Sequence, residues 1–202
     1  MKSHLTSFGT PGIGVVPYGV HMCRFYPSRQ DLIDGLIPYF LAGLENNERC
    51  IWMASASLPA GEIEIEIARS PELARGVAAR QFVIADAIDW YGDPATLQAD
   101  EIIRRLIDEE ERALADGSQG LRIAGNMSFI PRAHWDRLMD YENRLNHWLK
   151  DRRILMCCNY HRGECWPVDV LEVVHRHDGA LDRAGKHWHV FFAPPRPALC
   201  NA

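Results

Sequence analysis

The sequence predicts a three-layer α/β fold in which a mainly parallel central sheet is flanked by helices. Strand-like and helix-like runs alternate along most of the chain, which is the pattern of consecutive βα units. Several strand-like runs, such as 50–54, 82–85 and 154–158, are continuously apolar. Runs of this kind are typical of strands that helices cover on both faces, so we expect one sheet between two helical layers.

The first half of the predicted core contains two strands and two helices. Their expected limits are a strand over 21–26, a helix over 30–44, a strand over 49–55 and a helix over 62–69. The last segment is ambiguous, because Ile and Glu alternate strictly as in a strand. Ile63 and Ile67 also lie four residues apart, as on one face of a helix, and we therefore predict a helix.

The second half continues the alternation to the end of the domain. We expect strands over 81–87, 121–126, 154–160 and 187–192, and helices over 95–116, 134–150 and 168–177. In the long helix, apolar residues gather on one face and the acidic run 108–111 lies around the other. We interpret these acids as a solvated helix face and not as a metal cluster.

Length and composition predict a single globular domain. The 202 residues are 47% hydrophobic and 24% charged, which is ordinary for a folded protein. Residues 19–192 are expected to form the domain, preceded by a flexible Gly/Pro-rich leader over 1–18 and followed by a Pro-rich tail over 193–202. The sequence shows no signal peptide and no apolar run long enough to span a membrane, so we expect a cytoplasmic protein without membrane contact.

Charge and cysteine usage limit the possible partners and chemistry. The formal net charge is −5 with no long block of Lys or Arg, so direct binding to nucleic acid is not expected. The six cysteines show no C-x-x-C spacing, and several lie inside apolar strand-like runs. We therefore expect reduced thiols and not a disulfide framework.

Seven blocks, in order over about 19–185, carry a resemblance to a known family. They are His21-Met-Cys-Arg-Phe-Tyr, Leu36-Ile-Pro-Tyr-Phe-Leu-Ala-Gly-Leu with Asn47-Glu-Arg-Cys-Ile-Trp, Asp89-Trp-Tyr, Gly120-Leu-Arg-Ile-Ala-Gly-Asn-Met, Tyr141-Glu-Asn-Arg-Leu, Cys158-Asn-Tyr, and the pair His175 and His177. Together they resemble the MEDS family, the sensory domains of methanogens, methylotrophs and the dichloromethane regulator. The resemblance implies a prokaryotic signal-transduction domain, with a role in transcription regulation, that senses a small organic molecule, a hydrocarbon derivative in particular. It also implies output through a signalling partner or a homodimer.

The same blocks are similar to a RecA/KaiC-like core that has lost its phosphate-binding loop. The segment after the strand 49–55 reads Ser-Leu-Pro-Ala-Gly-Glu and places Glu62 where a phosphate loop has its lysine. The strand 121–126 ends without the acid that would hold magnesium. We therefore expect neither ATP hydrolysis nor other enzymatic activity; a degenerate ATPase that acts as a scaffold is a further alternative.

The predicted ligand site combines strand positions with the family motifs. His21 and Cys23 share one strand face, as do Cys158 and Tyr160. Asn126 and Tyr160 lie at carboxyl ends of strands, where parallel sheets bind ligands. The full set of candidate ligand-binding residues is His21, Cys23, Trp90, Tyr91, Asn126, Glu142, Cys158, Tyr160 and His175. Of these, Asn126, Glu142 and His175 depend on the resemblance.

Other interpretations of these residues stay open. Each of them is also compatible with core packing, capping or a solvated position. No cofactor is expected in the ligand-sensor interpretation. The alternative is a metal, haem or redox sensor, with zinc or haem held by Cys23, His21, Cys158 and His177. Nucleophilic catalysis by a Cys-His pair is a third possibility, although no oxyanion loop signature supports it.

Overall fold

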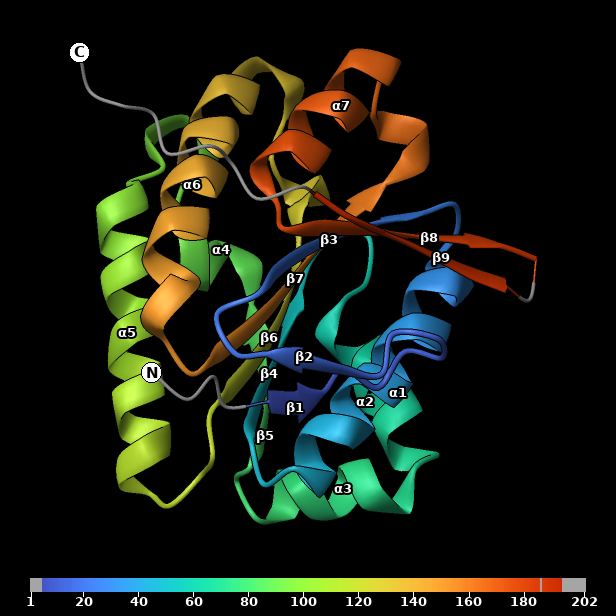
Figure 1. The fold of residues 1–202 in the computed structure, drawn as a ribbon, viewed down its shortest axis with the longest axis vertical. Coiled ribbons are helices and arrows are strands. Elements are labelled where there is room, and N and C mark those ends of the chain that lie inside the picture. Colours follow the sequence, from blue (N-terminus) through green and yellow to red (C-terminus); the bar gives the residue numbers. More distant parts are fainter. Residues whose placement is uncertain (1–4, 186, 194–202) are drawn as a thin grey trace.

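The computed structural model describes residues 5–185 and 187–193 and confirms the predicted α/β class (Figure 1). Its main sheet has seven strands. They are β3 (His21–Tyr26), β4 (Arg49–Ala54), β5 (Phe82–Asp86), β6 (Leu121–Asn126), β7 (Ile154–His161), β8 (Gly179–Ala184) and β9 (His187–Phe192). The strand order is β5-β4-β6-β7-β3-β8-β9, and every neighbouring pair is parallel except β8 and β9.

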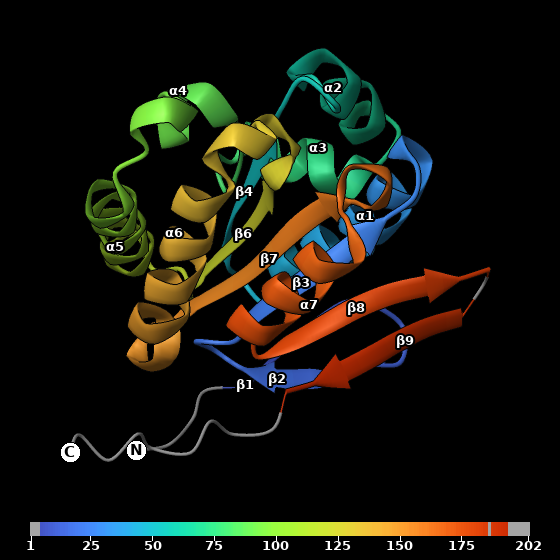
Figure 2. The ribbon, with the colours of Figure 1, turned by 90° about the horizontal axis from the view of Figure 1, so that it is seen from above.

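Helices cover both faces of this sheet (Figure 2). On one side lie α1 (Arg29–Glu45), α2 (Ala60–Ala68) and α3 (Pro71–Ala78). On the other side lie α4 (Ala87–Tyr91), α5 (Ala99–Ala115), α6 (Trp135–Trp148) and α7 (Pro167–Arg176). Short 3₁₀ turns complete the connections: η1 (Pro94–Thr96), η2 (Met127–Phe129), η3 (Arg132–His134), η4 (Leu149–Asp151) and η5 (Arg162–Glu164).

Strand alternation divides the core into two halves. In β3, Cys23 and Phe25 lie on the side of the sheet that α6 and α7 cover, whereas Met22 and Tyr26 face α1. The β3–β7 register pairs Cys23 with Cys158, so these two residues share the α6 side of the sheet. This alternation decides which candidate residues can meet.

The structure resolves the ambiguous segment as a helix. In α2, Ile63 and Ile67 are buried, while Ile65 is 54% exposed. Residues four apart therefore form the buried face of this helix. The glutamates between the isoleucines lie on its outer face and keep that face polar. The next helix, α3, was not predicted, although Ser70 caps it and Pro71 occupies its first turn, as a helix start requires.

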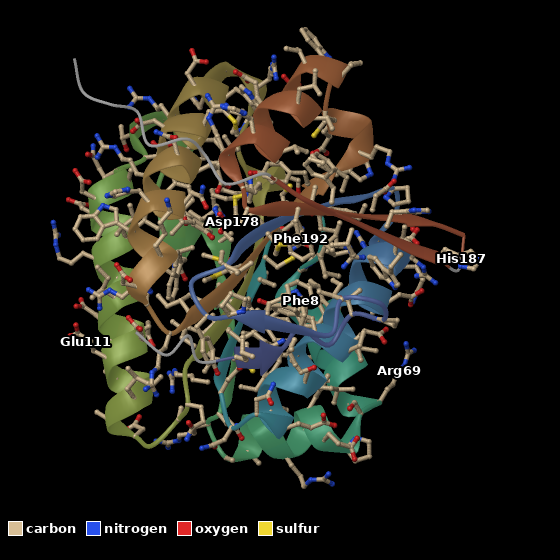
Figure 3. The ribbon with its side chains drawn as sticks, in the orientation of Figure 1. Phe8, Arg69, Glu111, Asp178, His187 and Phe192 are labelled. Carbon is tan, nitrogen blue, oxygen red and sulfur yellow. The ribbon has the colours of Figure 1, made fainter. Side chains whose placement is uncertain are left out.

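The prediction of a flexible leader over 1–18 is wrong for the described residues 5–18. They form a two-stranded antiparallel sheet of β1 (Leu5–Ser7) and β2 (Val15–Pro17). Phe8, labelled in Figure 3, is 1% exposed and packs on the α1 side of the core. The glycines give tight turns here and not flexibility: Gly9 has φ +89°, and a Cβ on it would lie 2.4 Å from the Pro38 carbonyl oxygen.

Three further details of the sequence prediction are corrected. Residues 95–98 precede α5, which begins at Ala99. Within the acidic run, Glu109 and Glu110 are 8% and 3% exposed, because they pair with arginines: Glu109 with Arg49, and Glu110 with Arg152. Strand β8 was missed, since its Gly-Ala-Leu-Asp-Arg-Ala sequence lacks both a long apolar run and β-branched residues.

Two other predictions concern the ends of the chain and the membrane. Apart from Ala193, the predicted Pro-rich tail over 193–202 lies outside the described residues. Within residues 5–185 and 187–193, none of the helices combines the length and the apolar character needed to cross a bilayer.

Candidate functional site

Four buried polar side chains from four different elements meet on the α6 side of the sheet. We call them the core cluster: His21 of β3, Glu142 of α6, Cys158 of β7 and His177, which follows α7. Each is at most 1% exposed. One nitrogen, oxygen or sulfur atom from each residue lies within 4.8 Å of those of the other three.

Glu142 is at the centre of the contacts within the core cluster. Its Oε2 lies 3.2 Å from His21 Nε2, 3.5 Å from His177 Nε2 and 3.7 Å from Cys158 Sγ. The Cys158 sulfur is also 3.3 Å from His21 Nε2, and the two imidazole rings lie 3.9 Å apart between centroids. The other carboxylate oxygen, Oε1, accepts a 2.6 Å hydrogen bond from the hydroxyl of Tyr160.

Local structure explains the position of each member. Helix α7 ends at Arg176, and His177 takes an extended conformation with φ −114° and ψ 159°. Its Nδ1 contacts the Val173 carbonyl oxygen at 2.7 Å, which directs Nε2 toward Glu142. The next residue, Asp178, accepts a hydrogen bond from the His21 backbone amide at 3.0 Å and so fixes the end of α7 to β3. Figure 3 marks Asp178 at this junction.

Burial controls the charges of the core cluster. Desolvation lowers the pKa of His21 and of His177 to about 3, so both imidazoles are neutral at neutral pH. The same effect raises the pKa of Glu142 above its ordinary value and that of the Cys158 thiol well above. Neither histidine therefore supplies a positive charge to balance a Glu142 carboxylate.

A cavity lies next to the core cluster at the carboxyl ends of β6 and β7. We call it the Tyr160 pocket; its volume is about 410 Å³. Its lining consists of Met127, Ser128, Ile130, Pro131, Arg132, Trp135, Tyr160, His161, Gly163, Glu164, Cys165 and Trp166. Tyr160 belongs to this lining and also donates to Glu142, so it connects the pocket to the core cluster.

A larger hollow of about 1190 Å³ follows the β5 edge of the sheet. Residues at the amino ends of the strands line it, including Arg49 and Phe82. Parallel sheets bind ligands at their carboxyl ends, and this hollow contains none of the predicted site residues. The Tyr160 pocket is therefore the better candidate.

Comparison with known proteins identifies the family. The profile of the MEDS family, described as MEthanogen/methylotroph, DcmR Sensory domain, matches residues 20–178. The chain belongs to the MEDS family. It is thus a sensory domain, as the motif blocks predicted.

The fold of this MEDS domain is similar to that of a KaiC-like protein. The crystal structure of a KaiC-like protein from the hyperthermophilic archaeon Pyrococcus horikoshii OT3 superposes with a TM-score of 0.63. The match covers 94% of this chain and 88% of the archaeal one, at 13% sequence identity. At this identity the likeness shows a shared fold and nothing more. None of the curated proteins compared with the chain matches it.

The MEDS domain brings five of the predicted ligand-binding residues together: His21, Cys23, Glu142, Cys158 and Tyr160. Of the five, Tyr160 lines the Tyr160 pocket, whereas His21 and Cys23 are completely buried. The expectation that His21 and Cys23 line an open pocket therefore does not match the geometry. They lie behind the pocket and do not form its wall.

Trp90 and Tyr91 lie in α4, on the same side of the sheet. The Tyr91 ring stacks on Phe129 at 5.0 Å and meets Tyr141 edge to face at 5.9 Å. Trp90 lies under the guanidinium of Arg105, 4.2 Å from the ring centre, and so packs toward α5. Core packing accounts for Trp90, whereas Tyr91 reaches toward the core cluster.

Two predicted site residues, Asn126 and His175, lie elsewhere. Asn126 faces the α1 side, because Arg122, Ala124 and Asn126 alternate with the residues of β6 that face α6. It accepts a hydrogen bond from Tyr26 at 3.1 Å and donates one to Ser57 at 2.9 Å. His175 is exposed on α7 and is not part of the core cluster.

Of the four residues in the metal alternative, three lie together and one does not. His21, Cys158 and His177 meet, but the fourth member of the core cluster is Glu142 and not Cys23. The Cys23 thiol instead donates to the Gly179 carbonyl oxygen at 3.5 Å. His187 and His189 share one face of β9 and are not part of the core cluster, and Figure 3 shows His187 at the tip of the β8–β9 hairpin, away from Asp178.

The sequence analysis missed most of the pocket lining. Trp135, Cys165 and Trp166 lie in the segments that follow β6 and β7. A usable signal was present, because aromatic residues that closely follow two parallel strands are expected at the ligand-binding edge of the sheet.

Proposed function

We propose that this MEDS domain senses a small organic molecule, a hydrocarbon derivative with one polar group, bound in the Tyr160 pocket. The observation that carries the proposal is the position of Tyr160, which lines the pocket and hydrogen-bonds to Glu142 of the core cluster. A ligand that contacts Tyr160 therefore touches a side chain whose partner lies in the interior of the domain.

The pocket has the chemistry that such a ligand needs. Met127, Ile130, Pro131 and the indoles of Trp135 and Trp166 supply apolar contact area. The pocket also has charged groups of both signs, Arg132 and Glu164. Arg132 forms an ion pair with Asp169 at 2.5 Å, and its guanidinium lies over both indole rings. A wall that combines apolar surface with polar groups favours a small molecule with an apolar body and one polar end.

Affinity is limited by the size of the ligand. A molecule of about four non-hydrogen atoms gains at most about 6 kcal/mol of binding free energy, because even the best small ligands gain about 1.5 kcal/mol per atom. We therefore expect weak binding and a sensor that responds to high concentrations of its ligand.

The path of the signal follows from the elements around Glu142. A shift of Tyr160 changes its hydrogen bond to Glu142 on α6, and Glu142 contacts His177 at the end of α7. Helix α7 also carries exposed apolar side chains, with Val168 55% and Leu171 71% exposed. We propose that movement of α7 passes the signal to a partner protein or a second copy of the chain.

Tryptophan fluorescence provides the test, since Trp135 and Trp166 line the pocket. The full chain is titrated to millimolar concentrations with a short-chain alcohol, an amine and a haloalkane. We expect a saturable change with at least one of them. Trp166→Ala should weaken that binding about fivefold, because the lost ring contact contributes roughly 1 kcal/mol.

Trp148→Ala is the matched control. Trp148 is 51% exposed, against 63% for Trp166, but it lies outside the Tyr160 pocket. The control should bind as the unaltered chain does. Equal binding by Trp166→Ala and the unaltered chain, or no saturable change with any of the three probes, would contradict the proposal.

A further inference from the structure

The core cluster presents two imidazole nitrogens, one sulfur and one carboxylate oxygen toward a common centre. We propose that His21, Glu142, Cys158 and His177 bind one divalent transition-metal ion of the zinc class. The proposal concerns a site separate from the Tyr160 pocket and does not depend on the organic ligand.

The distances match tetrahedral coordination. Bond lengths of about 2.0 to 2.3 Å from zinc to nitrogen, oxygen and sulfur place neighbouring ligand atoms about 3.3 to 3.6 Å apart. The measured separations are 3.2 Å for His21 to Glu142, 3.3 Å for His21 to Cys158, 3.5 Å for His177 to Glu142 and 3.7 Å for Cys158 to Glu142. These are four of the six separations among the ligand atoms, and all six are within 4.8 Å.

Hydrogen bonds around the core cluster occupy the atoms that a metal ion would not use and leave the ligand atoms available. His177 Nδ1 is engaged by the Val173 carbonyl oxygen, so its Nε2 points into the core cluster, where it has no hydrogen bond. Tyr160 holds Glu142 Oε1 and leaves Oε2 toward the centre. Metal-binding histidines commonly donate their second nitrogen to a carbonyl, and ligating carboxylates are themselves hydrogen-bonded.

His21 has a comparable outer partner in Asn146. The His21 Nδ1 and Asn146 Oδ1 atoms are both buried without a hydrogen bond, and the Asn146 side chain is a neighbour of His21 that partly opposes the lowering of its pKa by burial. A metal ion at Nε2 fixes the imidazole proton on Nδ1. Asn146 Oδ1 then becomes the acceptor for that proton, which satisfies both atoms.

Charge balance also favours a cation. Binding removes the proton from the Cys158 thiol, and from Glu142 where it is protonated, and releases these protons to the solvent. The resulting thiolate and carboxylate carry two negative charges, which a divalent ion neutralises, while the imidazoles bind as neutral ligands. Nitrogen and sulfur donors select zinc-class ions over magnesium or calcium.

The same geometry argues against two other metal sites, one with Cys23 as a ligand and one that holds haem. Cys23 is buried on the same side of the sheet, but its thiol donates to Gly179 and is not part of the core cluster. A haem group does not fit, because the four side chains are at most 1% exposed and their donor atoms lie within 4.8 Å of one another.

Elemental analysis of the purified full chain, before and after reconstitution with zinc under reducing conditions, tests the proposal. We expect one zinc ion per chain. Replacement with Co²⁺ should give the visible bands of tetrahedral cobalt and a thiolate-to-cobalt charge-transfer band in the near ultraviolet. Cys158→Ser should abolish the charge-transfer band, and His177→Gln should lower zinc affinity more than about 100-fold, since even outer contacts of a metal commonly contribute 10- to 100-fold.

Two cysteine variants serve as controls. Cys157→Ser changes the neighbouring residue of β7, which is equally buried but faces the α1 side, and Cys23→Ser changes the nearby thiol that is not a ligand. Both should keep one metal ion and the charge-transfer band, with circular dichroism to verify folding. A chain without stoichiometric metal after reconstitution, or a charge-transfer band that persists in Cys158→Ser, would overturn the assignment.

Discussion

Arg122 and Glu48 form an ion pair that is completely buried near the amino ends of the strands. Arg122 also donates to the carbonyl oxygens of Phe8 at 2.9 Å and Tyr39 at 2.7 Å, while Tyr18 donates to Glu48 at 2.7 Å. These bonds compensate the desolvation of both charges. Glu48 thus joins β4, β6 and the segment before β3 through polar contacts.

Removal of one member of this pair should be strongly destabilising. Arg122→Met leaves the Glu48 carboxylate buried without its partner, so we expect a loss of about 3–5 kcal/mol in the free energy of unfolding. The control is Arg29→Ala, which breaks the exposed pair of Arg29 with Glu62 and should cost less than about 1 kcal/mol. Urea denaturation measures both, and similar losses for the two variants would contradict this account.

At the residue scale, the sequence predicted side-chain faces within a strand but not between strands. The alternation rule correctly placed His21 with Cys23, and Cys158 with Tyr160. It could not place Asn126, because that requires the register between β6 and β7. His175 and His177 were ambiguous for a related reason, since the exact end of α7 decides which histidine turns inward.

Among the elements, the β1–β2 pair depends on a few buried side chains. Phe8 packs 5.1 Å from the Tyr39 ring, and Val16 is 3% exposed. The glycines between the two strands suggested a flexible leader, but the pair is anchored by these contacts and by the bonds of Arg122 to the backbone of Ser7 and Phe8.

Truncation of Phe8 tests this anchoring. Phe8→Ala should cost about 3–5 kcal/mol of stability, as for other buried phenylalanines. Val15→Ala is the control in the same strand pair, because Val15 is 64% exposed and should change stability by less than about 0.5 kcal/mol. Thermal unfolding compares the variants. An unaltered melting temperature for Phe8→Ala would restore the interpretation of a flexible leader.

Helices and strands with a clear hydrophobic period were predictable from the sequence, and short elements were not. Strands β3, β6 and β9 begin and end as predicted, and α1 and α7 differ by one residue at each end. Helices α3 and α4 are only eight and five residues long, too short for a hydrophobic period to emerge. Strand β8 forms by pairing with β3 and β9 and not through its own propensity.

Considered as a whole, the molecule has a KaiC-like arrangement of strands and helices, and an exposed ion pair lies after β4, at the start of α2. Arg29 forms a 2.5 Å ion pair with Glu62 in the first turn of α2 and donates to the Ser57 carbonyl oxygen at 2.9 Å. A phosphate group would meet a carboxylate here and would lack the lysine and the glycine amides that bind it.

The segment after β4 leads to an expectation about nucleotides. The chain should not bind ATP with magnesium at low micromolar concentrations, because Glu62 repels the phosphates. Isothermal titration calorimetry of the full chain measures the affinity for ATP with magnesium. The variant Glu62→Ala measures how much of the weak binding is due to repulsion by the carboxylate. A low micromolar dissociation constant for the unaltered chain would contradict both the non-enzymatic and the non-nucleotide interpretation.

The exposed apolar side chains of α7 should affect assembly. Leu171→Glu should shift the chain toward monomer, or abolish binding to its signalling partner, without loss of stability, because Leu171 is 71% exposed. Analytical ultracentrifugation with and without ligand measures the oligomeric state. Val15→Glu is the control, because it places the same charge at another exposed apolar position, 64% exposed and outside α7. A strictly monomeric chain under both conditions, together with unaltered partner binding by Leu171→Glu, would contradict a role for this face.

The central claim is that ligand enters the Tyr160 pocket, and methyl NMR spectroscopy tests it most directly. Met127 and Ile130 line this pocket, whereas Ile67 lines the larger hollow at the β5 edge and Ile63 lies in the core beneath α2. Titration with the probe that alters tryptophan fluorescence should shift the Met127 and Ile130 methyl signals and leave those of Ile63 and Ile67 in place. Shifts confined to Ile67, or no saturable shift at Met127 and Ile130, would contradict the account.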